Sequence, residues 1–282
     1  MEKKQTFEDF FRYKNPNYEF LLSRMRCAFD VKEVTFDDIN TLNMIRFKKY
    51  MTDEVHNSSL KVYMAVIAAT VNMLTADGLC QHIDFKPINR VKCEKSEHIA
   101  LTEEEVNLFI GYYNRIKNQK SIDRDILTLF LLEALTGARL SDVKKFDSSS
   151  ISDGYLSYVS QKTHTLTRVP VHKMVPMLLE RVPDKEYSRM TTNRKIKAIA
   201  KKLGINKPEK RMYRGVLKTR PRYELIASHT SRRTFISLLL DKGVPLATVS
   251  KLAGHSDTSM TLRYYCSDEL QLNDAAMSFF NS

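Results

Sequence analysis

Residues 122–137, IDRDILTLFLLEALTG, give the first structural expectation for this chain of 282 residues. Apolar side chains recur through the stretch at the spacing of a helix. Gly137 is a typical helix end, because glycine adopts the left-handed conformation without steric penalty. Upstream, Thr102 and Glu105 have the spacing of a capping box. The sequence therefore predicts two consecutive helices, one beginning near residue 102 and one ending at Gly137.

The pattern changes after this helix. Segments 154–161 (GYLSYVSQ) and 166–172 (LTRVPVH) are rich in β-forming residues and flank the polar turn 162–165, which predicts a hairpin. Helical patterns resume afterwards, with Ser228 as the expected cap of one of them. The expected helices cover residues 174–182, 191–203, 229–242, 246–253 and 267–279. The second half of the chain is thus expected to be mainly helical, with one small hairpin.

The first hundred residues predict a separate helical unit. Apolar spacing predicts helices over 17–29, 35–53 and 57–77. Residues 79–100 contain a proline, scattered charges and no clear period, which is typical of a linker. We therefore expect three parts, namely a helical domain over 1–85, a linker over 86–100 and a second domain over 101–282.

The composition is that of a folded protein, with 43% hydrophobic and 10% aromatic residues. This excludes disorder of the whole chain. A run of 18 apolar residues and the apolar core of a signal peptide are both missing, so we predict a cytoplasmic protein with no membrane association. The cysteines are far apart and form no C-x-x-C pair, which argues against a zinc site or a disulfide framework. They are Cys27, Cys80, Cys93 and Cys266.

The net charge of +12 originates in one segment. Residues 162–233 contain 20 basic and 5 acidic residues, a balance of +15. The segments 1–100, 101–161 and 234–282 balance at +1, −2 and −2. A local excess of this size favours a polyanionic partner, most simply the phosphate backbone of a nucleic acid, over a merely solvated basic face.

A set of residues suited to phosphate chemistry runs through the second domain. An arginine follows Thr-Gly-Ala in LTGARLSD (135–142), and a lysine opens the hairpin turn. The sequence HTSR (229–232) is followed 23 residues later by the histidine of AGH, and nine residues after that by a tyrosine. The candidate site residues are Arg139, Lys162, His229, Arg232, His255 and Tyr264. Their order and spacing resemble the active site of the tyrosine recombinase (phage integrase) family, from about residue 100 to the end.

The arginine and histidine positions suit cleavage of a phosphodiester. Nucleophilic attack builds negative charge on the equatorial oxygens, which the ionised guanidiniums of Arg139 and Arg232 can hold with paired hydrogen bonds. The resemblance implies proton transfer at His229. It implies that His255 either donates a hydrogen bond to the phosphate or positions the tyrosine.

The remaining positions have neighbours that compete for the same role. By resemblance Lys162 is the general acid for the leaving 5′-oxygen, with Lys173 as a competitor. Tyr264 and Tyr265 point about 100° apart on a helix, and the family interval of nine selects Tyr264 as nucleophile. Asp142 stands where the family commonly has Glu, which is a departure that removes no catalytic group.

The resemblance also implies the architecture and the partners. The fold is expected to be mainly α with a small β-sheet, as an N-terminal helical core-binding (SAM-like) domain and an α+β catalytic domain that close on DNA. The expected partner is double-stranded DNA with specific target sites, bound by a homotetramer of chains that are monomers in solution. No cofactor and no metal are expected, since a phosphotyrosyl ester conserves the energy of the broken bond. The short N-terminus suggests the two-domain type without an arm-binding domain, from a mobile genetic element.

Three functions are compatible with the sequence. The main expectation is a site-specific recombinase that forms a 3′-phosphotyrosyl intermediate at Tyr264. A type IB topoisomerase-like relaxing enzyme would use related chemistry, and a catalytically silent DNA-binding regulator would need only the basic segment. The apolar stripe of helix 267–279 is compatible with packing on its own domain or on a neighbouring protomer.

Overall fold

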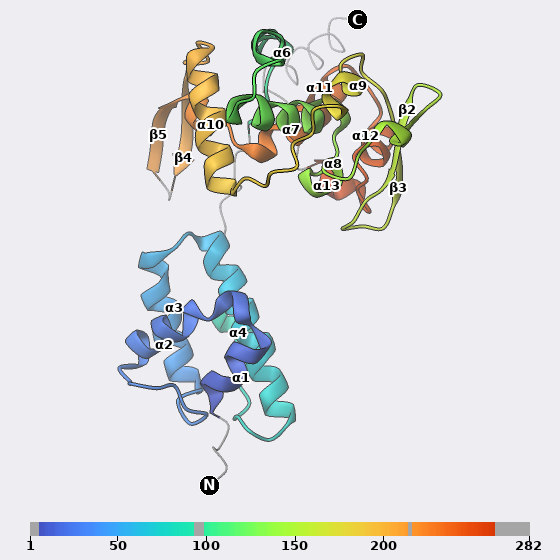
Figure 1. Ribbon diagram of the computed structural model, residues 1–282. Helices are drawn as coiled ribbons and strands as arrows, with labels where there is room; N and C mark the ends of the chain where they lie inside the picture. Colours follow the sequence, from blue (N-terminus) through green and yellow to red (C-terminus); the bar gives the residue numbers. More distant parts are fainter. Residues whose placement is uncertain (1–5, 93–98, 214–215, 263–282) are drawn as a thin grey trace, which may run out of the picture. The chain divides into compact units, whose positions relative to one another are not determined.

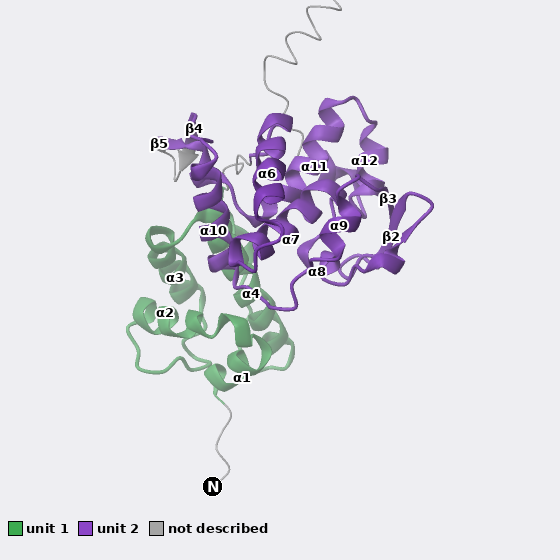
Figure 2. Cartoon of the chain, turned by 45° about the horizontal axis from the view of Figure 1, so that its top comes forward, with its two compact units in different colours: residues 1–96 green, residues 97–282 purple. Residues whose placement is uncertain are grey.

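The computed structural model describes residues 6–92, 99–213 and 216–262 (Figure 1). The chain forms two compact units, residues 1–96 and 97–282 (Figure 2). Tyr264, Tyr265 and the helix expected over 267–279 lie outside the described residues. Cys27 and Cys80 are free thiols, and the other two cysteines also lie outside.

The first unit is helical. Thr6 and Asp9 form a capping box at its first helix, and the side chain of Asn40 caps another by accepting from the Asn43 N–H. Its elements are α1 (Phe7–Lys14), η1 (Pro16–Tyr18), α2 (Phe20–Phe29), α3 (Thr41–Glu54), α4 (Asn57–Ala76) and α5 (Phe85–Ile88). Helices α1 and α5 are additional to those that the sequence predicts.

A buried carboxylate joins the helices at the N-terminal end of this unit. Glu8 on α1 is 2% exposed and pairs with Arg26 of α2 and Arg12. It also accepts a hydrogen bond from the backbone N–H of Val34 at 2.9 Å. Burial alone would raise the pKa of Glu8, but these hydrogen bonds outweigh it and hold the pKa below its ordinary value.

Helix α4 is the core helix of this unit. By length and composition alone it is the one described helix that could cross a membrane. Leu60, Met64, Ile67 and Leu74, however, are buried in a core shared with α1, α2 and α3. The core helix of a folded unit meets the same criterion, so the criterion assigns no membrane role to α4.

The second unit alternates helices with short strands. It begins with α6 (Glu103–Ile116), α7 (Ile122–Thr136) and α8 (Leu140–Val143), then η2 (Ser148–Ser150), β1 (Ile151–Ser152), β2 (Tyr155–Val159) and β3 (Leu166–Pro170). It continues with α9 (Val175–Leu179), α10 (Arg189–Lys202), β4 (Pro208–Tyr213), β5 (Val216–Pro221), η3 (Arg222–Leu225), α11 (Ser228–Asp241), α12 (Leu246–Leu252) and α13 (Thr258–Leu262). The fold is mainly helical with small antiparallel sheets, as predicted.

Helix α7 lies at the centre of this unit. It contacts α6, α8, α9, α10 and α11 (Figure 1). From Ile126 to Ala134 every side chain is buried. The predicted capping box at Thr102 begins α6, and Gly137 ends α7 in the left-handed conformation. Local chemistry therefore fixes the start of α6 and the end of α7, and packing surrounds α7 between its ends.

The predicted hairpin is present as β2 and β3. The strands are antiparallel, with Val159 opposite Leu166, and β1 adds a third strand beside β2. In the turn, Ser160 N–H donates to Thr165 O at 3.0 Å, and His164 has a φ of 51°. This conformation, which few residues other than glycine and asparagine adopt, makes a tight turn possible.

A second hairpin, β4–β5, was not predicted. Its strands pair from Pro208 opposite Pro221 to Tyr213 opposite Val216. The sequence in this region consists of basic runs without the apolar alternation that signals a strand. The expected cap of α11 is also corrected by one residue, because Ser228 is its first helical residue and Ala227 precedes it.

A largely buried arginine attaches this second hairpin to the body of the unit. Arg222 is paired with both carboxylate oxygens of Glu105, at 2.6 and 2.9 Å, and with Glu209 at 2.9 Å. It also donates to Ala100 O at 2.6 Å. The start of α6 and the base of β4–β5 are thus held by one guanidinium.

Gly137 offers a test of this packing. Its φ is +68°, and an added Cβ would lie 2.3 Å from Phe235 Cδ1, whereas Gly204 has a φ of +78° with open space around it. Gly204→Ala should lower the free energy of unfolding by about 1–2 kcal/mol through backbone strain alone. Gly137→Ala should lose that and about 1–3 kcal/mol more through the clash. Urea titration of both variants checks this, and equal losses would contradict the close approach of Phe235.

Candidate active site

One cavity of about 470 Å³ in the second unit gathers five of the six predicted residues. They reach it from different elements: the end of α7, the β2–β3 turn, the first turns of α11 and the end of α12. The predicted lining residues are Arg139, Lys162, His229, Arg232 and His255. The remaining lining residues are Glu133, Leu140, Ser141, Tyr187, Arg189, Thr192, Ser228 and Met260. The sixth predicted residue, Tyr264, lies outside the described residues.

Arg232 is the most deeply held of these side chains. It is 4% exposed, donates from Nη1 to Gly137 O, and donates from Nη2 to Ala253 O at 2.6 Å. Both carbonyls belong to helix ends, where backbone oxygens lack partners within the helix. Arg232 therefore fixes the ends of α7 and α12 relative to α11 while it lines the cavity.

Arg139 is linked to the hairpin through Ser160, which in turn contacts a buried carboxylate. It donates to Ser160 Oγ at 2.9 Å, and Ser160 Oγ donates to Asp142 Oδ2 at 3.3 Å. Asp142, 2% exposed, also accepts from the Gln161 N–H at 3.0 Å. The shorter carboxylate at this position thus reaches the base of the turn that carries Lys162.

The turn carrying Lys162 packs against the loop after α12. Thr163 Oγ1 donates to Gly254 O at 3.3 Å. A Cβ at Gly254 would lie 2.7 Å from Thr167 Oγ1, so only glycine allows this approach. Lys162 itself is exposed at the mouth of the cavity. The hairpin is therefore held next to His255, with its lysine towards solvent.

His255 is buried and held in one orientation. It is 7% exposed, and its Nδ1 lies 2.7 Å from Oγ1 of Thr261, a fully buried residue of α13. Burial, followed by the charges of Arg232 and Arg139, lowers the pKa of His255 to about 4. The imidazole is therefore neutral at physiological pH.

His229 occupies a more open position on the first turn of α11. Partial loss of solvation lowers its pKa, and the neighbouring charges of Arg189, Arg233 and Arg232 lower it further. The turn is anchored from outside, because Asn193 Oδ1 accepts the Ser228 N–H at 2.9 Å. A neutral imidazole at this position can accept a proton.

Several residues of the site escaped the sequence analysis. Glu133, Ser160 and Thr261 are buried polar residues that contact predicted members or the segments that carry them. Their signal is weak, because a Ser or Thr in a polar stretch has many uses, and a single Glu in a helix is usually exposed. Within the described ranges, no three His, Cys, Asp or Glu side chains gather in a way that could hold a metal ion.

The second unit is similar in sequence to known integrases. Residues 100–271 match the model of the Phage integrase family. The integrase of Escherichia phage 186 is 23% identical over 214 residues, which cover 75% of this chain and 57% of the relative. The integrase of Escherichia phage P2 is 25% identical over 196 residues, covering 65% and 49%. The chain thus spans about half the length of these curated relatives.

Solved structures show the same fold at low sequence identity. A lambda integrase (75–356) dimer bound to a core site has a TM-score of 0.64 at 17% identity, with 91% of this chain and 90% of that one covered. The XerH recombinase bound to a palindromic difH substrate has a TM-score of 0.66 at 16% identity, with coverage of 95% and 80%.

The neutrality of His255 is directly measurable. Its folded pKa is depressed below the unfolded value of about 6.5, so it contributes stability above pH 6.5 that is lost as the pH falls towards 4. Nitrogen-detected NMR of the imidazole should show neutral His255 down to about pH 5. Thr261→Val should shift the Nδ1 resonance, and an imidazole that titrates near 6.5 would contradict this environment.

Proposed function

Since the chain belongs to the phage integrase family, we propose that it is a site-specific DNA recombinase that cuts and rejoins strands through a 3′-phosphotyrosyl intermediate at Tyr264. The observation that carries the proposal is the single cavity shared by Arg139, Lys162, His229, Arg232 and His255. These five residues come from four separate segments of the chain. Their convergence supports a common chemical task.

The two arginines are proposed to hold the scissile phosphate. Guanidiniums remain ionised at all relevant pH values and bind phosphate oxygens in pairs. Arg232 is fixed by two backbone carbonyls and Arg139 by Ser160, so the donors are oriented before the substrate arrives. Preorganised donors of this kind stabilise the charge that develops in the transition state.

The histidines are proposed to share two tasks. His255, neutral and fixed by Thr261, donates or accepts a hydrogen bond without adding charge. His229, more exposed and with a lowered pKa, is suited to take the proton of the attacking phenol. Tyr264 follows Thr261 by three residues in the chain, so the segment that holds His255 leads directly to the proposed nucleophile.

The partner is proposed to be double-stranded DNA with specific sites, bound by a homotetramer assembled from monomers in the cytoplasm. The lambda integrase structures that share this fold contain a dimer on a core site and a tetramer on a Holliday junction. The charge excess of residues 162–233 supports contact with the phosphate backbone. By the same likeness, residues 1–85 are proposed to be a core-binding domain and residues 101–282 the catalytic domain, joined by the 86–100 linker, in a chain from a mobile genetic element.

Tyr264→Phe should abolish the covalent protein–DNA adduct, because phenylalanine has no hydroxyl to attack phosphorus. Suicide substrates carrying the sites cloned from the flanks of the element, resolved on denaturing gels, provide the measurement. Tyr265→Phe is the matched control and should retain the adduct, while Arg139→Ala should reduce its rate by about 100- to 1,000-fold.

Three results would separate the functions. An adduct that survives Tyr264→Phe contradicts the assigned nucleophile. Relaxation of supercoiled DNA by the monomer without paired sites would favour the topoisomerase-like activity. Full biological function of both Tyr264→Phe and Arg139→Ala would favour a silent DNA-binding regulator.

Lys162 is testable by changing the leaving group. Lys162→Ala should slow cleavage of ordinary DNA by about 100- to 10,000-fold, since the 5′-oxygen then leaves without a proton. A substrate with sulfur in place of that oxygen should restore the rate, because a thiolate, with a pKa near 8.5, leaves without protonation. Lys173→Ala is the control, and a Lys162→Ala defect that persists on the sulfur substrate would contradict the general-acid role.

A further inference from the structure

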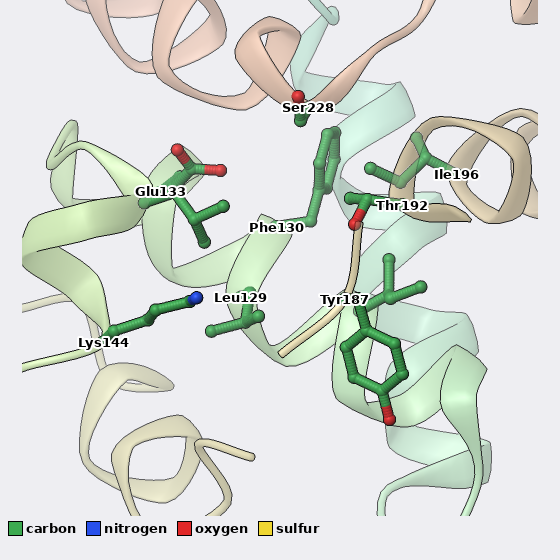
Figure 3. Close-up of a pocket in the computed structure, with 10 residues that line it drawn as sticks. Leu129, Phe130, Glu133, Lys144, Tyr187, Thr192, Ile196 and Ser228 are labelled. Carbon is green, nitrogen blue, oxygen red and sulfur yellow. The ribbon is translucent and has the colours of Figure 1, made fainter. Parts of the chain in front are cut away.

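Glu133 is a buried acid of α7 that the proposed chemistry does not use. It is 3% exposed and lies between the active-site cavity and a small, mostly apolar hollow. Figure 3 shows it with Leu129, Phe130 and Ile196 around this hollow, and with Ser228 of α11 nearby. A carboxyl group in such a place needs either a partner or a proton.

Its contacts lead to both arginines of the site. Glu133 Oε2 lies 3.1 Å from Ser231 Oγ, and Ser231 immediately precedes Arg232. The backbone N–H of Leu140, the residue after Arg139, also hydrogen-bonds to this carboxyl group. One side chain therefore contacts the two segments from which the guanidiniums project.

The hydroxyl of Ser231 has two neighbours but one hydrogen. It lies 2.5 Å from Ser228 O and 3.1 Å from the Glu133 carboxyl. The carbonyl oxygen can only accept, so the closer contact takes the Ser231 hydrogen. The contact with Glu133 is then a hydrogen bond only if the carboxyl group supplies the proton. When Glu133 is ionised, Ser231 must turn towards it and release Ser228 O in the first turn of α11.

The charged groups around Glu133 come from several elements. Arg232 faces it from α11. Other charged or titratable groups that line the same cavity include Arg139, Lys162, Arg189, His229 and His255. Lys144, at the end of α8, lines the hollow but is paired with Glu186 at 2.5 Å. Tyr187 also lines the hollow, and its hydroxyl donates to Asp125 at 2.6 Å. Arg232 is the charge that an ionised Glu133 would offset most directly.

We propose that Glu133 is a positioning residue: in its protonated form it holds the segments of Arg139 and Arg232 so that both guanidiniums can bind the same phosphate. We call this pair of guanidiniums the arginine cradle. Ionisation of Glu133 weakens the binding of phosphate by the cradle. The inference rests on the proposed function, in which the two arginines bind the scissile phosphate. Burial, opposed by Ser231, Arg232 and Leu140, raises the pKa of Glu133 to about 8. The protonated form therefore predominates at neutral pH, and ionisation begins in the mildly alkaline range.

Three substitutions separate positioning from folding. Glu133→Gln keeps the shape and places a permanent N–H donor opposite Ser231, as the protonated acid does. Glu133→Leu removes the donor but suits the apolar hollow, so it should fold with equal or higher stability. Glu104→Gln makes the same chemical change at an exposed position of α6 and is the matched control.

Stability against pH tests the proton without any catalysis. Glu133 has a folded pKa above its unfolded value of about 4.3, so its contribution is complete below that pH and is lost as the pH rises through about 8. The Tm of the unaltered chain should therefore fall relative to that of Glu133→Gln between pH 5 and 9. A constant Tm difference over this range would overturn the inference.

Anion binding and adduct formation test the cradle. Sulfate keeps its charge from pH 6 to 9.5 and serves as a probe for phosphate binding. Its affinity is measured from the increase in Tm that it causes. Only the part of that increase that Arg139→Gln abolishes is assigned to the site. Between pH 7 and 9, the sulfate affinity of Glu133→Gln divided by that of the unaltered chain should rise about tenfold. The same ratio of adduct rates should rise by the same factor, because only about a tenth of Glu133 stays protonated at pH 9.

Glu133→Leu should lose about ten- to a hundredfold in adduct rate at every pH without loss of stability. A Glu133→Leu variant with unaltered rate and sulfate affinity, or a pH-independent ratio for Glu133→Gln, overturns the inference. If the unaltered chain forms no adduct, the proposed function fails, and the sulfate titration still decides on the role of Glu133.

Discussion

The arrangement of the site depends on one buried cation, Arg232. Its guanidinium donates to Gly137 O and Ala253 O, the backbone oxygens at the ends of α7 and α12. Arg139 follows Gly137 by two residues, and His255 follows Ala253 by two. A side chain on α11 thereby fixes where two other segments leave their helices, and with them two members of the site. In the proposed function, binding and positioning are combined in this one group, since a guanidinium has five donors in a rigid plane.

The hairpin is the more adjustable part of the site. It is attached at its base by Asp142 and Ser160, and at its turn by Thr163 and Gly254. The contact of Ser160 with Asp142 is buried, whereas the contact of Thr163 with Gly254 at the turn is a single, part-buried hydrogen bond. Arg232, in contrast, is buried among helix ends and donates to two of them. Local stability follows burial and the number of contacts, so the turn with Lys162 is expected to open more readily than the arginine cradle. If Lys162 has its proposed role as general acid, such a turn lets it move with the leaving oxygen while the phosphate stays in place.

The sequence predicted those features of the structure that neighbouring residues determine. Gly137 ends α7 with a positive φ, as its sequence position predicts, and the predicted capping box at Thr102 is formed. The β2–β3 hairpin was equally clear, because its β-forming residues and its polar turn lie within 20 residues of each other. The second hairpin was not predictable, since its charged strands lack that alternation and its attachment depends on Arg222 reaching Glu105, 117 residues away in the chain.

Site residues followed the same rule. Those with a family motif were predicted from order and spacing, and the structure brings the described ones to one cavity. Glu133 and Thr261 act through contacts that arise only when α7 meets α11, or when α13 folds back on the loop after α12. No local sequence pattern distinguishes a buried, protonated glutamate that contacts a serine from an exposed glutamate. Such residues become visible only after packing is known.

The packing of the second unit also determines where its positive charge is neutralised and where it is not. The acidic segment 101–161 supplies carboxylates that pair with basic side chains of 162–233, such as Glu105 with Arg222 and Asp123 with Lys195. These ion pairs neutralise positive charge away from the active-site cavity. The cavity, in contrast, is lined by Arg139, Lys162, Arg189 and Arg232 and by one carboxyl group, that of Glu133. Asp142, the other acid nearby, is occupied by Ser160 and the Gln161 N–H. Four cationic side chains therefore face one carboxyl group among the described lining residues, and a cavity in which that acid is protonated retains the strongest field for a phosphate.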